Sequence, residues 1–110
     1  MKRYVGTRTP DGCSVEVIDA EGGREPLDPR YDLRNHSPDG FSHGYAGSGP
    51  AQLALALLAD ALADDQQAAR LYQDFKRKVV ARLQGDEWEL SQDDILATVA
   101  ELEADRTRGR

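Results

Sequence analysis

Three scarcities in the sequence each exclude a class of protein. Cys13 is the only cysteine among 110 residues, so the chain forms no internal disulfide and is not a disulfide-stabilised secreted scaffold. The longest apolar run, residues 51–59, is interrupted by Gln52 and ends at Asp60, whereas a membrane-spanning helix needs about 20 apolar residues. The N-terminal segment lacks the apolar stretch of a secretion signal. We therefore expect a cytoplasmic protein that does not contact a membrane.

Positive charge is also scarce, because 14 Lys and Arg residues face 20 Asp and Glu residues for a net charge of −6. A nucleic-acid-binding surface needs basic groups that replace the counterions of the phosphates, so direct nucleic acid binding is not expected. The exception is a locally basic segment with Arg70, Lys76, Arg77, Lys78 and Arg82. We interpret it as a solvated helix face with ion pairs; docking to an acidic partner or to nucleic acid is the alternative.

The length and the pattern of apolar residues predict one α+β domain over residues 1–110. A β-hairpin is expected over residues 3–19, because two β-rich segments flank the turn sequence Thr9–Gly12. An isolated hairpin is only marginally stable, so we expect a third strand at Trp88–Leu90. The predicted fold is a small two- or three-stranded antiparallel sheet packed against three helices.

Three segments show helical periodicity: residues 50–63, 66–84 and 91–105. Pro50 suits the first turn of a helix, and the leucines and alanines that follow point to every side, which places this first helix at the centre of the domain. The second segment has apolar residues at every third or fourth position. The third begins with Ser91 and Asp94, whose spacing is typical of a capping box.

Between the hairpin and the helices, residues 20–49 show no clear periodicity and are expected to form a long loop. The segment contains most of the glycines and prolines of the chain. Loops longer than about 15 residues are uncommon in compact domains and are usually functional or disordered. Tyr31, Leu33, Phe41 and Tyr45 can anchor this one to the core, which favours an ordered loop.

The most unusual segment is residues 44–50, here called the glycine-rich loop, which runs directly into the first predicted helix. Glycine-rich turns expose backbone N–H groups and a helix N-terminus carries partial positive charge, so together they can hold an anion. The segment is not a Walker motif, because no lysine follows and Pro50 removes a donor. The alternative is that the glycines only permit a sharp turn against the helix. The candidate ligand-binding residues are Gly44, Tyr45, Gly47, Ser48 and Gly49, with His43 and Arg34 beside them.

Reactive side chains are sparse. His36, His43, Asp32 and Asp39 share the long loop, but their spacing matches no metal-binding motif, and we expect neither a metal nor a cofactor. Ser48, His43 and Asp39 are the residue types of a nucleophilic triad, but the turn that exposes a nucleophile is missing. The sequence therefore favours a non-catalytic domain over an enzyme.

Two blocks of the sequence, residues 38–58 and residues 72–80, resemble a family of small uncharacterised proteins from bacteria, archaea and their viruses. The first block contains the run GYAGSGPAQLALALL, and the resemblance extends over about residues 27–96. In that family the position of His43 is commonly Trp and that of Ala46 is commonly Gly. The resemblance implies that the glycine-rich loop matters, but it supplies no reaction.

Two functions follow from these observations. The first is a small cytoplasmic binding domain that seats an anionic ligand, such as a nucleotide or a phosphate group, at the glycine-rich loop and the start of the following helix. The alternative rests on the occurrence of the family in viruses. It is a protein-interaction factor that inhibits a host defence complex, in the manner of an anti-CRISPR or another anti-defence protein. The expected partner is thus an anionic small molecule or a protein.

Overall fold

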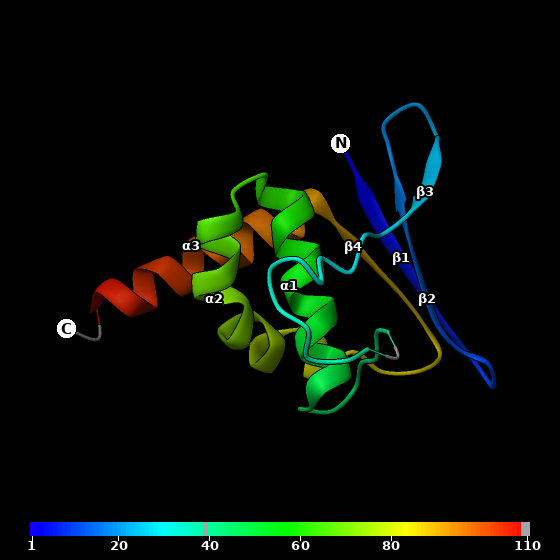
Figure 1. The fold of residues 1–110 in the computed structure, drawn as a ribbon. Coiled ribbons are helices and arrows are strands. Elements are labelled where there is room, and N and C mark those ends of the chain that lie inside the picture. The colour runs from blue at the N-terminus through cyan, green and yellow to red at the C-terminus, as the bar shows by residue number, and fades with distance from the viewer. Residues whose placement is uncertain (39, 109–110) are drawn as a thin grey trace.

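The fold is α+β, and the computed structural model describes residues 1–38 and 40–108 (Figure 1). Its antiparallel sheet contains, in spatial order, β3 (Arg24–Pro26), β2 (Gly12–Ile18), β1 (Arg3–Thr9) and β4 (Glu87–Ser91). The predicted hairpin is β1 paired with β2, with Thr9 opposite Gly12. β4 contains the strand predicted at Trp88–Leu90 and pairs with the other side of β1, so that Gly6 lies opposite Trp88.

The prediction of two or three strands was wrong, because the sheet of the described residues has four. The missed strand β3 lies in the segment 20–49 that we interpreted as a loop. It is only three residues long, and Pro26 masks it because proline is rare within strands. The chain returns to the sheet through a turn closed by the Asp19 carboxylate, which accepts hydrogen bonds from the N–H groups of Glu21 and Gly23.

Four helical elements complete the fold: α1 (Ser48–Leu62), α2 (Asp65–Lys78), the 3-10 helix η1 (Val80–Arg82) and α3 (Gln92–Arg108). Two helix caps are present, and the second of them was predicted. Asp64 Oδ1 accepts from the N–H of Gln67, and Ser91 and Asp94 exchange side-chain to backbone hydrogen bonds of 3.0 and 3.2 Å as a capping box. Within the described residues, no helix has both the length and the apolar character that a bilayer crossing requires.

The helix expected over residues 66–84 ends at Lys78, and the chain continues as η1. A physical reason lies in the long loop, because the N–H of Gly44 donates to the carbonyl of Val80 at 3.0 Å. Val80 is completely buried at this break. The packing of a distant segment therefore supports a break that helical periodicity alone does not reveal.

Helix α1 lies between the sheet and the other two helices (Figure 1). Its leucines at positions 53, 55, 57 and 58 are at most 1 % exposed, although they point to different sides of the helix. The remaining core comes from every layer: Tyr4 of β1, Trp88 of β4, Phe75 of α2 and Ile95 of α3. α1 is thus the element against which the sheet, the long loop and α2 pack.

One polar side chain, Gln52, is completely buried in α1. Its Oε1 accepts from the N–H groups of His36 at 2.8 Å and Ser37 at 3.3 Å. Its Nε2 donates to the carbonyls of Pro29 at 2.6 Å and Arg34 at 3.0 Å. One side chain thus serves four backbone groups of the long loop, which otherwise lacks regular hydrogen bonding.

Replacing Gln52 by Leu is expected to lower the free energy of unfolding by about 3 kcal/mol, because backbone groups lose their partners in a buried setting. Urea denaturation followed by circular dichroism measures the change. Gln66→Leu is the matched control, since Gln66 is exposed on α2 and its replacement is expected to change stability by less than about 0.5 kcal/mol. Equal effects of the two substitutions would contradict the assigned role of Gln52.

A second buried polar contact joins the sheet to α1. The hydroxyl of Tyr4 donates to Asp60 Oδ2 at 2.7 Å, and Lys2 Nζ lies 3.2 Å from the same oxygen. Burial raises the pKa of the Tyr4 hydroxyl well above its usual range, and the hydrogen bond and the negative charge of Asp60 raise it further. The folded protein therefore favours the protonated form of Tyr4.

Because the folded-state pKa of Tyr4 is raised, its contribution to stability is complete below the unfolded pKa of about 10 and is lost as the pH rises above that value. We expect Tyr4→Phe to cost about 1–2 kcal/mol at neutral pH and to flatten the fall of stability above about pH 10. Tyr45→Phe, which alters an exposed tyrosine, should do neither. Denaturation in urea at a series of pH values tests both statements.

Candidate functional site

The glycine-rich loop is anchored by His43, which is 2 % exposed. Its Nε2 lies 2.8 Å from the carbonyl oxygen of Gly85, and its ring meets that of Trp88 edge-on with 6.2 Å between the ring centres. His43 was expected as a ligand-binding residue, but the structure places its side chain in the interior. It positions the loop instead of facing a ligand.

Gly44 connects the loop to η1. Its φ of +85° lies in the region that favours glycine, and a Cβ at this position would stand 3.1 Å from the carbonyl oxygen of Leu83. Its N–H is the donor to the Val80 carbonyl described above. The backbone of the loop is therefore fixed at its first residue, while Gly44, Tyr45 and Ala46 remain exposed.

The side chain of Tyr45 folds back over the start of α1. A Cβ on Gly47 would lie 2.6 Å from the Tyr45 ring, and a Cβ on Gly49 would lie 3.4 Å from its hydroxyl oxygen. Gly49 also packs against Ser42, whose Cβ would be only 2.7 Å from an added Cβ. These two glycines thus allow close approach, while Tyr45 itself remains 53 % exposed.

The N-terminus of α1 has no side-chain cap. Its N-cap residue Gly47 is extended, and the first turn contains no acidic residue. Among the residues that the structure describes, the N–H groups of Ser48 and Gly49 have no acceptor. Ser48 is exposed whereas Gly49 is buried, so the positive end of the helix is open to solvent on the side of Ser48.

Arg8 belongs to the site, although the sequence analysis missed it. Its Nη2 donates to the carbonyl of His43 at 2.6 Å and would lie 3.7 Å from a Cβ on Gly44. Within residues 1–38 and 40–108 the guanidinium forms no ion pair. The sequence did contain one indication of this position. Side chains alternate between the two faces of a strand, which puts Arg8 on the same face of β1 as the buried Tyr4 and Gly6.

The other predicted residues lie elsewhere. Arg34 is exposed, and its Nη1 donates to the neighbouring Leu33 carbonyl at 2.8 Å. His36 Nε2 lies 2.6 Å from the Tyr72 hydroxyl oxygen, and Asp39 is outside the described residues. In the part of the chain that the structure describes, no three His, Cys, Asp or Glu residues gather as metal ligands.

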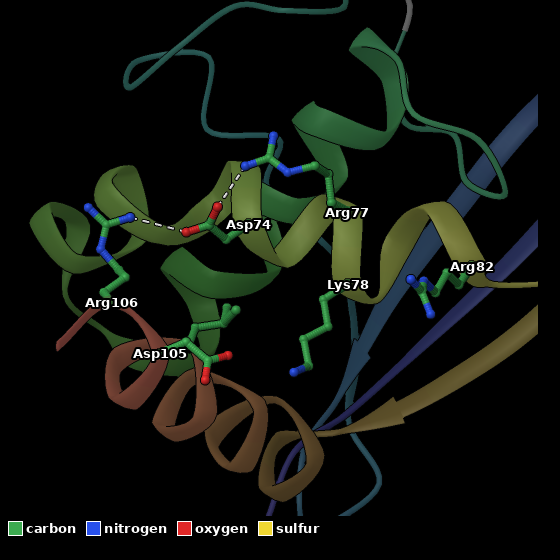
Figure 2. Close-up of a pocket in the computed structure, with 7 residues that line it drawn as sticks. Asp74, Arg77, Lys78, Arg82, Asp105 and Arg106 are labelled. Atoms are coloured by element: carbon green, nitrogen blue, oxygen red, sulfur yellow. Dashed lines mark hydrogen bonds and ion pairs between the residues drawn. The ribbon is translucent and has the colours of Figure 1, made fainter. Parts of the chain in front are cut away.

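A second polar feature is a cavity of about 530 Å³ between the end of α2, η1 and α3, here called the α2–α3 pocket (Figure 2). It is lined by four basic residues, two acidic residues and one leucine: Arg77, Lys78, Arg82, Arg106, Asp74, Asp105 and Leu102. Asp74 accepts from Arg77 at 2.6 Å and from Arg106 at 3.1 Å. The tertiary structure thus gathers basic residues that we interpreted from sequence as a solvated helix face.

A protein-family model described as a family of unknown function (DUF6166) matches residues 4–101. The chain belongs to this family. The DUF6166 match covers the sheet except for Arg3, all of α1 and α2, and most of α3, and it confirms that the sequence resembles an uncharacterised family. No curated protein and no solved structure matches the chain. The function of this DUF6166 member must therefore be argued from its own geometry.

The close approach at the start of α1 can be tested with two alanine substitutions. Gly49→Ala places Cβ against Ser42 backbone and side-chain atoms, and we expect it to lower the free energy of unfolding by about 1–3 kcal/mol. Gly47→Ala meets only the exposed Tyr45 ring, which can turn away, so a cost below about 1 kcal/mol is expected. Thermal and urea denaturation measure both; a larger loss for Gly47→Ala would contradict the packing described here.

Proposed function

We propose that the protein is a small non-catalytic binding domain that holds an anionic group at the glycine-rich loop and the N-terminus of α1. One observation carries the proposal: the guanidinium of Arg8 is attached to the His43 carbonyl beside this loop without a carboxylate partner among the described residues. A fixed positive charge beside a loop that leads into an uncapped helix N-terminus is an arrangement that an anion neutralises.

The lack of a partner for Arg8 is informative because the protein is acidic. With a net charge of −6, carboxylates are plentiful, and most of the described basic side chains are in ion pairs. These residues are Lys2, Arg3, Arg24, Arg30, Arg70, Arg77, Lys78 and Arg106. Arg8 stands apart, since it is partly buried and, among the described residues, its one side-chain hydrogen bond goes to a backbone carbonyl.

The site offers three kinds of donor to a phosphate or carboxylate. A backbone N–H group comes from the exposed Ser48, a guanidinium from Arg8, and hydroxyl groups from Ser48 and Tyr45. Guanidinium groups and backbone N–H groups are the usual partners of phosphate oxygens in proteins. The exposed ring of Tyr45 also provides an aromatic surface beside these donors, which favours a nucleotide over a bare anion.

Catalysis is not part of the proposal. A hydrolase or transferase built on Ser48 would need His43 as a base, but the imidazole of His43 is buried and is in contact with the Gly85 carbonyl. Within the described residues, Ser48 and His43 form no hydrogen bond with each other. The arrangement therefore supports binding rather than activation of a nucleophile.

The test is a titration of ¹⁵N-labelled protein with inorganic phosphate and with adenosine 5′-diphosphate, followed by amide chemical shifts. We expect the largest shifts at residues 46–51, and about tenfold weaker binding in Arg8→Gln, because one charge-assisted hydrogen-bonding group is removed. Arg24→Gln is the charge-matched control, since Arg24 forms an exposed ion pair with Glu16, and it should bind as the wild type does.

An absence of shifts at residues 46–51 with both ligands would contradict the proposal. The same is true if Arg24→Gln weakens binding as much as Arg8→Gln, because a general charge effect would then explain the result. In either case the alternative expected from the sequence, a protein-interaction factor directed at a host defence complex, becomes the better hypothesis.

A further inference from the structure

The α2–α3 pocket concentrates positive charge in an acidic protein. Four of its seven lining residues are basic and two are acidic, whereas the whole chain carries −6. Part of this charge has an ordinary explanation, because Arg77 and Lys78 lie in the last turn of α2, where cations offset the helix dipole. The same explanation covers Arg106 in the last turn of α3, but it does not cover Arg82, which follows the end of α2 in η1.

Arg82 is the residue on which the inference rests. It forms no ion pair within the described part of the chain, yet it lines the pocket together with Lys78 and Arg77. Figure 2 shows Lys78 extending from α2 toward α3, while Arg82 borders the same cavity from η1. The pocket therefore contains a guanidinium whose charge no described carboxylate neutralises.

The remaining charges of the pocket are partly available. Asp74 is engaged by Arg77 and Arg106 at the same time, so its negative charge is shared between two guanidinium groups. Lys78 lies 3.1 Å from Glu101, but the two side chains are 42 % and 63 % exposed. Exposed pairs of this kind contribute little to stability, so Lys78 can exchange Glu101 for a ligand at low cost.

We propose that the α2–α3 pocket is a second binding site, which takes a small phosphate dianion through Arg82 and Lys78. Arg82 supplies a planar pair of donors to two phosphate oxygens, and Lys78 supplies a mobile point charge for the remaining oxygen. Two positive groups match the two negative charges of a phosphomonoester. Leu102 gives the pocket an apolar wall, which suits the carbon skeleton of such an ester.

The size of the pocket and the net negative charge of the protein favour a small anion over a polymer as the ligand. An open pocket of about 530 Å³ is within the size range of small-molecule sites. An extended polyanion such as a nucleic acid would reach beyond the pocket onto the surface of a chain with a net charge of −6, which opposes its binding. A small dianion contacts only the pocket. This inference is independent of the anion site proposed at the glycine-rich loop.

The experiment is a titration of the ¹⁵N-labelled full chain with inorganic phosphate and with glycerol 2-phosphate at millimolar concentrations, against sodium chloride of equal ionic strength. We expect amide shifts at residues 78–82 and 102–106 with both phosphates and not with chloride. Tighter binding of glycerol 2-phosphate identifies an ester as the ligand class, and tighter binding of inorganic phosphate identifies the free anion.

Four variants give the titration its specificity. Arg82→Gln should weaken binding at the pocket about tenfold, and Arg82→Lys should weaken it less, because the charge remains while the paired donors are lost. Asp74→Asn should strengthen binding severalfold, since it frees Arg77 and Arg106 for the ligand. Arg3→Gln, which removes an equal charge from an exposed pair with Glu89 on the sheet, should change the affinity less than about twofold.

The proposal is overturned if phosphate causes no shifts at residues 78–82, if chloride reproduces them, or if Arg3→Gln weakens binding as much as Arg82→Gln. It is also overturned if a single-stranded oligonucleotide binds this pocket more tightly than either phosphate in an Arg82-dependent way, since the site would then belong to a polymer. Arg8→Gln separates the two sites: it should weaken the binding seen at residues 46–51 about tenfold and leave the binding seen at residues 78–82 unchanged. A spectrum of each variant without ligand shows whether the variant folds. If Arg82→Gln does not fold, the comparison of Arg82→Lys with the wild type still tests the proposal.

Discussion

The hydrogen bonds of Gln52 hold the long loop against α1, and the glycine-rich loop depends on that attachment. The side-chain amide lies within an otherwise aliphatic helix and serves four backbone groups of the loop. A buried amide with all its donors and acceptors satisfied specifies one arrangement of the chain, because any shift leaves polar groups without partners. The segment from Pro29 to Ser37 therefore follows a defined path without regular secondary structure.

Two further contacts continue that path to the start of α1. Arg30 ties the loop to the first turn of α2, and the hydrogen bonds that it donates to Asp32 and then Asp65 raise its pKa above the usual range. The imidazole of His43 ties it to the Gly85 carbonyl on the other side of the domain. Between these anchors the chain turns through Gly44 and enters α1 with its N-terminus uncapped. The exposure of the glycine-rich loop is thus a consequence of rigid attachments on either side.

The two candidate anion sites differ in how they are built. At the glycine-rich loop, the proposed donors are the Ser48 N–H group and the hydroxyl groups of Ser48 and Tyr45, and one guanidinium comes from a distant strand. In the α2–α3 pocket, the donors are side chains from α2, η1 and α3. Each site contains one guanidinium, that of Arg8 or that of Arg82, which lacks a carboxylate partner among the described residues. In this acidic protein, the arginine side chains without a carboxylate partner therefore indicate where an anionic ligand can bind.

The sequence by itself determined the local elements: the hairpin β1–β2, the capping box at Ser91 and the apolar helix that became α1. Each of these depends on residues a few positions apart, and their pattern is visible in the printed chain. Only the tertiary structure decided the short strand β3, the end of α2 at Lys78, the interior position of His43, and the arrival of Arg8 and Arg82 at their sites. These features depend on partners far away in the sequence, such as Val80 for Gly44 and His43 for Arg8. Such partners are chosen by packing and by the satisfaction of buried polar groups, which local periodicity does not encode.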